Sequence, residues 1–144
     1  MRSCKELADA IMKFLKDNDI AEDVSIYVNN KRYSFVYYDY EAKEFLSDPF
    51  WKEEEGKFFP GDYFNYYAKQ HILSMSFEGE FYRIMNVEYE DEEWKDLHNS
   101  FNRLLESMGV WYECGDAWNL SVFPLKDNYD EWDYEDYRKG VDLL

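Results

Sequence analysis

The clearest hydrophobic pattern in the chain begins at Asp91 and predicts a helix. From Trp94 to Met108, apolar side chains recur every three or four residues, so they share one face of a helix. Gly109 follows at once, and a helix end favours a residue that can adopt positive φ. The apolar face consists of Trp94, Leu97, Phe101, Leu104, Leu105 and Met108. We therefore expect an amphipathic helix that packs on a core.

A hairpin is expected after this helix, ending at Pro124. Its strands are the short runs Val110–Cys114 and Ala117–Phe123. Gly115-Asp116 between them suits a tight two-residue turn that begins with glycine. That register places four apolar side chains on one face of the hairpin: Trp111, Trp118, Leu120 and Val122.

The first third of the chain predicts one helix and two strands. Ser3 and Glu6 have the spacing of a capping box, and periodic apolar residues then indicate a helix to about Asp17. Val24–Val28 alternates between apolar and polar residues as a strand does. An Asn-Asn-Lys turn leads from it to a second strand, Arg32–Tyr38.

The segment from Asp39 to about Gln70 has no regular period and is rich in aromatic residues. Asp48-Pro49 is typical of a helix start, so we expect a short helix over Pro49–Glu55 and a helical turn over Tyr63–Lys69. The aromatic residues are Phe45, Phe50, Trp51, Phe58, Phe59, Tyr63, Phe64, Tyr66 and Tyr67. A solvated linker would not carry them. This aromatic excursion should therefore either cover part of the sheet or present a surface for binding.

A further hairpin is expected from His71–Glu78 and Glu80–Val87, with Glu78-Gly79 as its loop. In that register Leu73 lies opposite Ile84 and Met75 lies opposite Tyr82, which collects the apolar residues on one face.

Together these elements predict an α+β fold in the order α-ββ-(aromatic excursion)-ββ-α-ββ. Every link between strands is a hairpin, so no parallel crossover is required. The expected architecture is an antiparallel meander of about six strands in three hairpins, with two main helices on one face. We expect one domain over residues 1–144, which ends in an acidic, aromatic tail over residues 125–144.

Composition supports a folded chain and a reducing compartment. Aromatic residues make up 21% of the 144 residues, which is too many for a disordered acidic chain. No apolar run approaches the length of a membrane span, and the N-terminus lacks the apolar region of a signal peptide. Cys4 and Cys114 form no CxxC motif, so we expect reduced thiols and a cytoplasmic location.

No residue pattern indicates catalysis, a cofactor or a metal. The only histidines are His71 and His98, and the six glycines form no phosphate-binding loop. Zinc would require histidine or cysteine clusters, which the sequence lacks. The run Asp127–Asp136 lacks the glycine that a calcium-binding EF-hand loop needs. We therefore expect no catalytic, cofactor-binding or metal-binding residues, and a protein that is not an enzyme.

Charge is the most informative bulk property. The chain has 32 Asp and Glu against 16 Lys and Arg, a net charge of −16. Such a surface repels nucleic acid and anionic membranes, so direct binding to either is not expected. A partner should instead be a basic protein, in particular a nucleic-acid-binding protein. The sequence says nothing about the oligomeric state.

The acidic residues cluster in the excursion, before the helix at Asp91 and in the tail, often beside tyrosine and tryptophan. Tyr and Trp are enriched at protein interfaces because they bury a large area at a low cost in entropy. The expected partner-binding residues are Glu53, Glu54, Glu55, Asp62, Tyr66, Tyr67, Glu90, Asp91, Glu92, Glu93, Asp130, Glu131, Trp132, Asp133, Glu135 and Asp136.

These patterns lead to one functional expectation and two alternatives. The expectation is an inhibitor that occupies the basic nucleic-acid-binding surface of a nuclease or another nucleic-acid-handling enzyme. In size and charge the chain resembles phage-borne anti-restriction and anti-CRISPR inhibitors as a class, a likeness of composition that no motif carries. The first alternative is an acidic adaptor, immunity or assembly protein that binds through a patch of Tyr and Trp. The second is a carboxylate-dependent enzyme.

Overall fold

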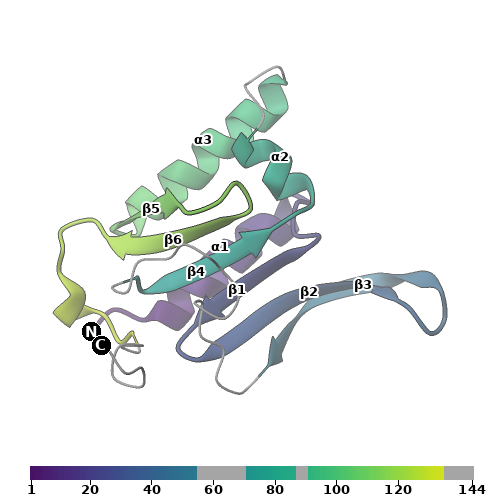
Figure 1. Cartoon of the computed structure of the whole chain (residues 1–144), viewed down its shortest axis with the longest axis horizontal. Helices are drawn as coiled ribbons and strands as arrows, with labels where there is room; N and C mark the ends of the chain where they lie inside the picture. Colours follow the sequence, from purple (N-terminus) through teal and green to yellow (C-terminus); the bar gives the residue numbers. More distant parts are fainter. Residues whose placement is uncertain (55–70, 87–90, 135–144) are drawn as a thin grey trace.

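A computed structural model describes residues 1–54, 71–86 and 91–134 of the chain (Figure 1). In these residues, six strands form one antiparallel sheet in the order β3-β2-β1-β4-β6-β5. The α+β fold with a six-stranded, meander-like sheet is therefore confirmed. The elements are α1 (Cys4–Asp17), β1 (Val24–Val28), β2 (Lys31–Asp39), β3 (Glu44–Glu54), β4 (Leu73–Phe77), α2 (Glu80–Asn86), α3 (Glu92–Ser107), β5 (Val110–Cys114), β6 (Asn119–Pro124) and the short 3₁₀ helix η2 (Tyr129–Glu131).

The N-terminal helix and the first hairpin form as their sequences predict. The Ser3 hydroxyl accepts a hydrogen bond from the Glu6 backbone N–H and so caps α1. Asn29 and Asn30 join β1 to β2 with φ angles of 49° and 64°. Two consecutive positive φ angles are typical of the two-residue turn whose twist matches antiparallel strands, and asparagine tolerates them better than most residues.

The expected helix over Pro49–Glu55 is wrong, because this sequence forms β3. The strand pairs with β2, and its register shifts between Val36, which lies opposite Phe50, and Tyr38, which lies opposite Phe45. Pro49 falls within this irregularity on an edge strand, where a missing N–H costs little. The expected helical turn over Tyr63–Lys69 lies outside the described residues.

The expected strand Glu80–Val87 is also wrong, because Glu80–Asn86 forms helix α2. Phe81 and Ile84, three residues apart, are buried together, whereas Tyr82 between them is exposed. A short apolar run is compatible with both the helix period and the strand period, so the sequence of this segment does not distinguish a helix from a strand. Gly79, between β4 and α2, allows a close approach to the loop that precedes β1, since a Cβ there would lie 2.5 Å from the Glu22 carbonyl oxygen.

The last hairpin contains the predicted strands but not the predicted register. Cys114 pairs with Leu120 rather than with Ala117, so the connecting loop is longer than Gly115-Asp116. Relative to the predicted pairing, the register shifts by an odd number of residues, so the side chains of one strand change faces relative to those of the other. Trp111 consequently lies opposite Phe123, with ring centroids 5.1 Å apart, and not beside Leu120 as predicted.

All three helices pack on one face of the sheet. Alternate residues of the strands point to this face and form a single core cluster with residues of α1, α2 and α3. The ring of Phe101 on α3 contacts Phe14 of α1, Phe81 of α2 and Tyr112 of β5, with centroid distances of 5.0 to 5.9 Å. The prediction of two main helices on one face is thus confirmed, with α2 as an additional short helix.

The opposite face of the sheet carries polar side chains at its centre. It is called the open face below because none of the three described helices covers it. His71 Nδ1 hydrogen-bonds the Ser74 hydroxyl, which lies 2.9 Å from the hydroxyl of Ser121 on the neighbouring strand β6. All three side chains are buried. Burial lowers the pKa of His71 from its usual 6.5 to about 4. The imidazole is therefore neutral at neutral pH.

No helix in the described part of the chain is long and apolar enough to cross a membrane.

The ring contacts of Phe101 predict a large cost for Phe101→Ala. Phe101 is fully buried, so truncation removes apolar contacts from all three helices and leaves a cavity. We expect the free energy of unfolding to fall by about 3–5 kcal/mol, measured by urea denaturation. Tyr40→Ala serves as the control, because its ring is 80% exposed. An equal loss of stability in both variants would contradict the assignment of Phe101 to the centre of the core.

The buried His71 predicts a loss of stability in mild acid. Between about pH 6.5 and about pH 4 the unfolded chain binds a proton on His71 that the folded chain does not, so stability falls as the pH falls. The contribution at pH 4 is roughly 3 kcal/mol. In His71→Asn this contribution disappears, so urea denaturation across this range should give a flatter pH profile than the unsubstituted chain. Parallel pH profiles would show that His71 has an ordinary pKa.

Candidate protein-binding surface

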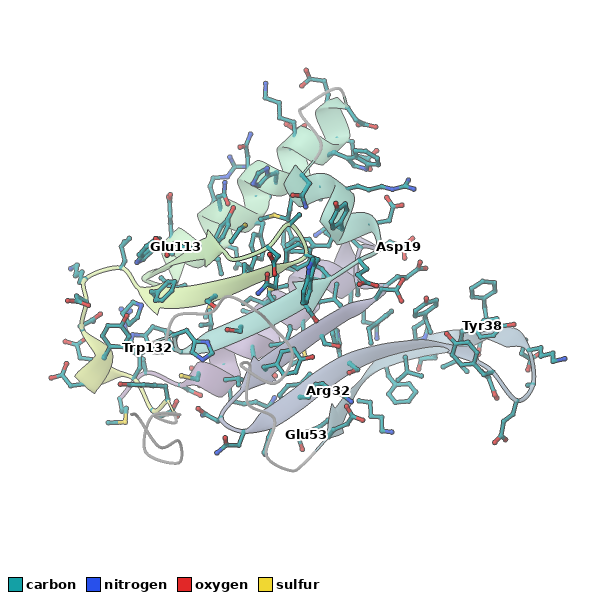
Figure 2. The ribbon with its side chains drawn as sticks, in the orientation of Figure 1. Asp19, Arg32, Tyr38, Glu53, Glu113 and Trp132 are labelled. Carbon is teal, nitrogen blue, oxygen red and sulfur yellow. The ribbon has the colours of Figure 1, made fainter. Side chains whose placement is uncertain are left out.

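The most exposed aromatic residues lie on a two-stranded arm. The pairing of β2 with β1 extends only as far as Ser34, whereas β2 and β3 remain paired to Asp39 and Glu44. Figure 1 shows this hairpin continuing away from the helices and the rest of the sheet. We call residues 37–50 the aromatic arm; Tyr38 is labelled on it in Figure 2.

Ring contacts run continuously along the aromatic arm. The ring centroid of Tyr38 lies 4.9 Å from that of Tyr40 and 5.1 Å from that of Phe45, both in edge-on arrangements. Tyr37 also lies beside Phe45, at 6.5 Å. Such pairs restrain one another, so the arm holds its rings in place before any partner binds.

Two hydrogen bonds fix the base of the aromatic arm to the body. Phe35 contacts Trp51 at a centroid distance of 5.1 Å, and the indole N–H of Trp51 donates to the Met12 carbonyl of α1 at 3.2 Å. The Tyr37 hydroxyl donates to Asp23 Oδ1 at 3.1 Å. Burial, together with this bond to the carboxylate, raises the pKa of Tyr37 to about 12, so the phenol remains a donor.

The tip of the aromatic arm is apolar, exposed and bordered by carboxylates. Tyr40 and Phe45 are 80% and 73% exposed, and Phe50, which lies opposite Val36 nearer the base, is 48% exposed. A hollow of about 550 Å³ lies between the rings and is lined by Tyr37, Tyr38, Tyr40, Lys43 and Phe45. The acidic residues of the arm are Asp39, Glu41, Glu44 and Asp48, and its one cation is Lys43. A continuous exposed patch of this kind is characteristic of a protein-binding site.

The outer edge of the aromatic arm is protected against pairing with another strand. β3 is an edge strand, and it contains a register irregularity, Pro49 and several charged side chains. These are the features with which proteins prevent edge-to-edge association. Binding at the arm would therefore involve its side chains rather than backbone hydrogen bonds.

The two predicted site residues on β3 take part in local interactions. Glu53 accepts hydrogen bonds from the Tyr33 hydroxyl at 2.5 Å and from Lys31 Nζ at 3.4 Å. Glu54 accepts from Arg32 Nε at 2.5 Å. The bond from Tyr33 lowers the pKa of Glu53, and the bond from Arg32 lowers that of Glu54. These carboxylates connect β3 to β2 and are already partly neutralised.

The predicted site residues at the start of α3 divide into a cap and an exposed pair. Asp91 Oδ1 accepts from the backbone N–H groups of Glu93 and Trp94 at 2.8 and 3.4 Å, so Asp91 is the N-cap. Glu92 and Glu93 are exposed in the first turn. Their charges stabilise the helix N-terminus and remain accessible to a partner.

The predicted site residues near the tail connect the two ends of the described chain. Asp133 Oδ1 accepts from the Cys4 backbone N–H at 2.7 Å, and the Arg2 guanidinium lies over the Trp132 ring at 5.4 Å. Trp132 is only 5% exposed and belongs to the core cluster, so its ring does not contribute to the surface. Asp130 and Glu131 are exposed on η2.

The structure does not bring all three of these acidic groups together. The turn between β1 and β2 links the β3 group to the tail group: the Asn29 side chain donates to the Asp133 carbonyl at 3.3 Å, and Lys31, directly after this turn, pairs with Glu53. The start of α3 lies in another part of the molecule (Figure 1). The acidic group at the start of α3 is therefore separate from the other two. The remaining predicted residues lie outside the described part of the chain; they are Glu55, Asp62, Tyr66, Tyr67, Glu90, Glu135 and Asp136.

Among the described residues, the groups capable of catalysis are dispersed. His98 Nε2 lies 3.2 Å from the Tyr112 hydroxyl, which donates to Asn102 Oδ1 at 2.6 Å. Cys114 is exposed as a residue, but neighbouring atoms partly shield its thiol from solvent, which raises the thiol pKa and lowers its reactivity. The described residues contain no group of three or more His, Cys, Asp or Glu side chains suited to hold a metal ion.

The sequence predicts the aromatic excursion from Asp39 but not the aromatic arm, which begins two residues earlier at Tyr37. The first aromatic run of the arm is Tyr37, Tyr38 and Tyr40. The useful signal was a second aromatic run, Phe45 to Trp51, at hairpin distance from the first across a polar loop. The expected helix at Pro49 concealed it.

Comparison with known protein families, with curated proteins and with solved structures finds no match to this chain.

Proposed function

We propose that this chain is a small acidic protein whose function is to bind another protein through the aromatic arm. The observation that carries the proposal is the exposed aromatic pair at the tip, Tyr40 and Phe45, whose rings both contact Tyr38. Rings held by their neighbours bind at a low cost in entropy, and aromatic residues dominate the energetics of many interfaces.

The chemistry of the aromatic arm specifies the partner. The rings require an apolar cleft, and the carboxylates around them favour Lys or Arg at the rim of that cleft. The overall charge of −16 favours encounter with the same kind of surface. The proposed partner is therefore a basic protein with an apolar cleft, and the proposed role is binding without catalysis. Free thiols at Cys4 and Cys114 support a cytoplasmic location.

The aromatic arm predicts that a double substitution at its tip abolishes binding. Placing a photo-crosslinking benzoylphenylalanine at position 40 and irradiating in lysate of the native host should attach the partner, which mass spectrometry identifies. With that partner purified, Tyr40→Ser combined with Phe45→Ser should weaken the affinity by about 30-fold or more in calorimetry, because exposed aromatic anchors carry most of the binding energy.

The matched control for this experiment is Trp111→Ser. Trp111 is a large, 38% exposed aromatic residue on β5, at the opposite edge of the sheet. It should leave the affinity unchanged, and circular dichroism should show that both variants are folded. If the double variant retains its affinity, or if Trp111→Ser weakens binding equally, the aromatic arm is not the binding surface.

The net charge supports a more specific candidate, an inhibitor that occupies the nucleic-acid-binding surface of a nuclease or a related enzyme. On the described residues from 71 to 134 the cations are few, namely Arg83, Lys95, Arg103 and Lys126, against many carboxylates. Such a complex would depend largely on charge attraction, which salt screens.

This candidate predicts a strong dependence on salt. Raising the ionic strength from about 50 to about 500 mM should weaken binding to the crosslinked partner by at least about tenfold, and excess duplex DNA should compete. The binding constant can be measured by calorimetry at each salt concentration. An affinity that does not change with salt would exclude charge mimicry and would leave binding through the aromatic arm intact.

A further inference from the structure

The open face of the sheet carries a row of serine side chains near the start of β1 and the end of β4. Ser25 on β1 is the register partner of Ser34 on β2 and of Ser76 on β4, so the three lie side by side on one face. The hydroxyl oxygens of Ser25 and Ser34 are 3.3 Å apart. Because serine is small, this row leaves space that larger strand residues would fill.

A pocket of about 350 Å³ lies at this row. Its chemistry comes from the three serine hydroxyls, from Trp118 in the loop between β5 and β6, and from the carboxylates of Asp23 and Glu78. The volume is within the range of small-molecule sites, and the walls combine hydrogen-bonding groups, an aromatic side chain and negative charge.

The two acidic residues of the pocket are neighbours along the backbone. Asp23 precedes β1 and Glu78 follows β4, and the Glu78 backbone N–H donates to the Asp23 carbonyl at 3.3 Å. Asp23 Oδ1 also accepts from the Tyr37 hydroxyl at 3.1 Å. No Lys or Arg of the described chain lines this pocket. Lys52, the register partner of Ser34 on β3, has an electrostatic interaction with Glu54 that lowers the pKa of that carboxyl.

We propose that this pocket binds an alkyl guanidinium or ammonium group. The N–H donors of such a cation would bond to the serine oxygens and to the carboxylates of Asp23 and Glu78. The Trp118 ring can add a cation–π contact. A neutral sugar could bond to the hydroxyls but would leave the charge of the carboxylates uncompensated. The site differs from the tip of the aromatic arm, but it shares Asp23 with the base of the arm, where this carboxylate accepts from the Tyr37 hydroxyl.

The test is an NMR titration of the full chain with propylguanidinium, compared with its neutral isostere propylurea. At constant ionic strength, propylguanidinium should shift the amide signals of Ser25, Ser34 and Ser76 and the indole signal of Trp118. The shifts should saturate with a dissociation constant on the order of 1 mM. Propylurea should leave these signals unchanged. Equal shifts with propylurea, or shifts that do not saturate, would overturn the proposal.

Charge-neutral variants test the role of the two carboxylates. Asp23→Asn combined with Glu78→Gln should weaken propylguanidinium binding by at least about tenfold, since it removes both charged acceptors. Asn is chosen because Asp23 has a φ of 60°, which Asn tolerates. The matched control is Glu106→Gln combined with Asp96→Asn, exposed carboxylates on α3 that remove the same charge. Equal weakening in both double variants would show general charge attraction and would overturn the site.

Two further ligands identify the source of the cation. N-acetyl-arginine methylamide presents the guanidinium as it occurs in a protein chain, whereas propylguanidinium represents a free small molecule. If both bind with similar affinity, the pocket accepts an arginine side chain of a protein. If only propylguanidinium binds, the natural ligand is a free cation. Stronger saturable shifts with MgCl₂ or CaCl₂ than with either guanidinium would contradict the assignment of an organic cation.

Discussion

The packing around Phe101 is the interaction on which the rest of the fold depends. Its ring contacts α1 through Phe14, α2 through Phe81 and β5 through Tyr112. Phe81 in turn contacts Phe77 on the central strand β4 at 5.0 Å. One ring cluster therefore joins every helix to the sheet. Since dense packing resists any change of volume, this cluster fixes all three helices on the same face.

Because the helices pack on one face of the sheet, the open face is available for binding. Its central positions are polar, and they are paired across strands, as in the contact between Ser74 and Ser121. Farther along, the small side chains of Ser25, Ser34 and Ser76 create the pocket. Beyond Ser34, β2 pairs only with β3 among the described strands, and the two form the aromatic arm. Both proposed binding sites thus lie where the helices do not cover the sheet.

The sequence correctly predicted those elements whose local pattern fits only one type of secondary structure. Helix α3 and its Asp91 cap follow from a long apolar period, and the first hairpin follows from Asn29-Asn30. Glu80–Asn86 is too short for its period to distinguish a helix from a strand. The register of the last hairpin depends on loop length, and one odd shift moved Trp111 to the other face. The sites depend on which strands become neighbours, and this is decided by tertiary packing.

Tertiary packing also determines which acidic residues remain available to a partner. Several acidic residues that stand out in the sequence have structural roles: Asp91 caps α3, Asp133 binds the first turn of α1, and Glu54 pairs with Arg32. A carboxylate that already accepts such bonds has less to offer a partner. The rings of Tyr40 and Phe45, in contrast, are exposed to water, and burying them in an interface would be favourable in free energy. The aromatic arm therefore carries the stronger argument for binding, and the negative charge is better understood as selecting which partner reaches it.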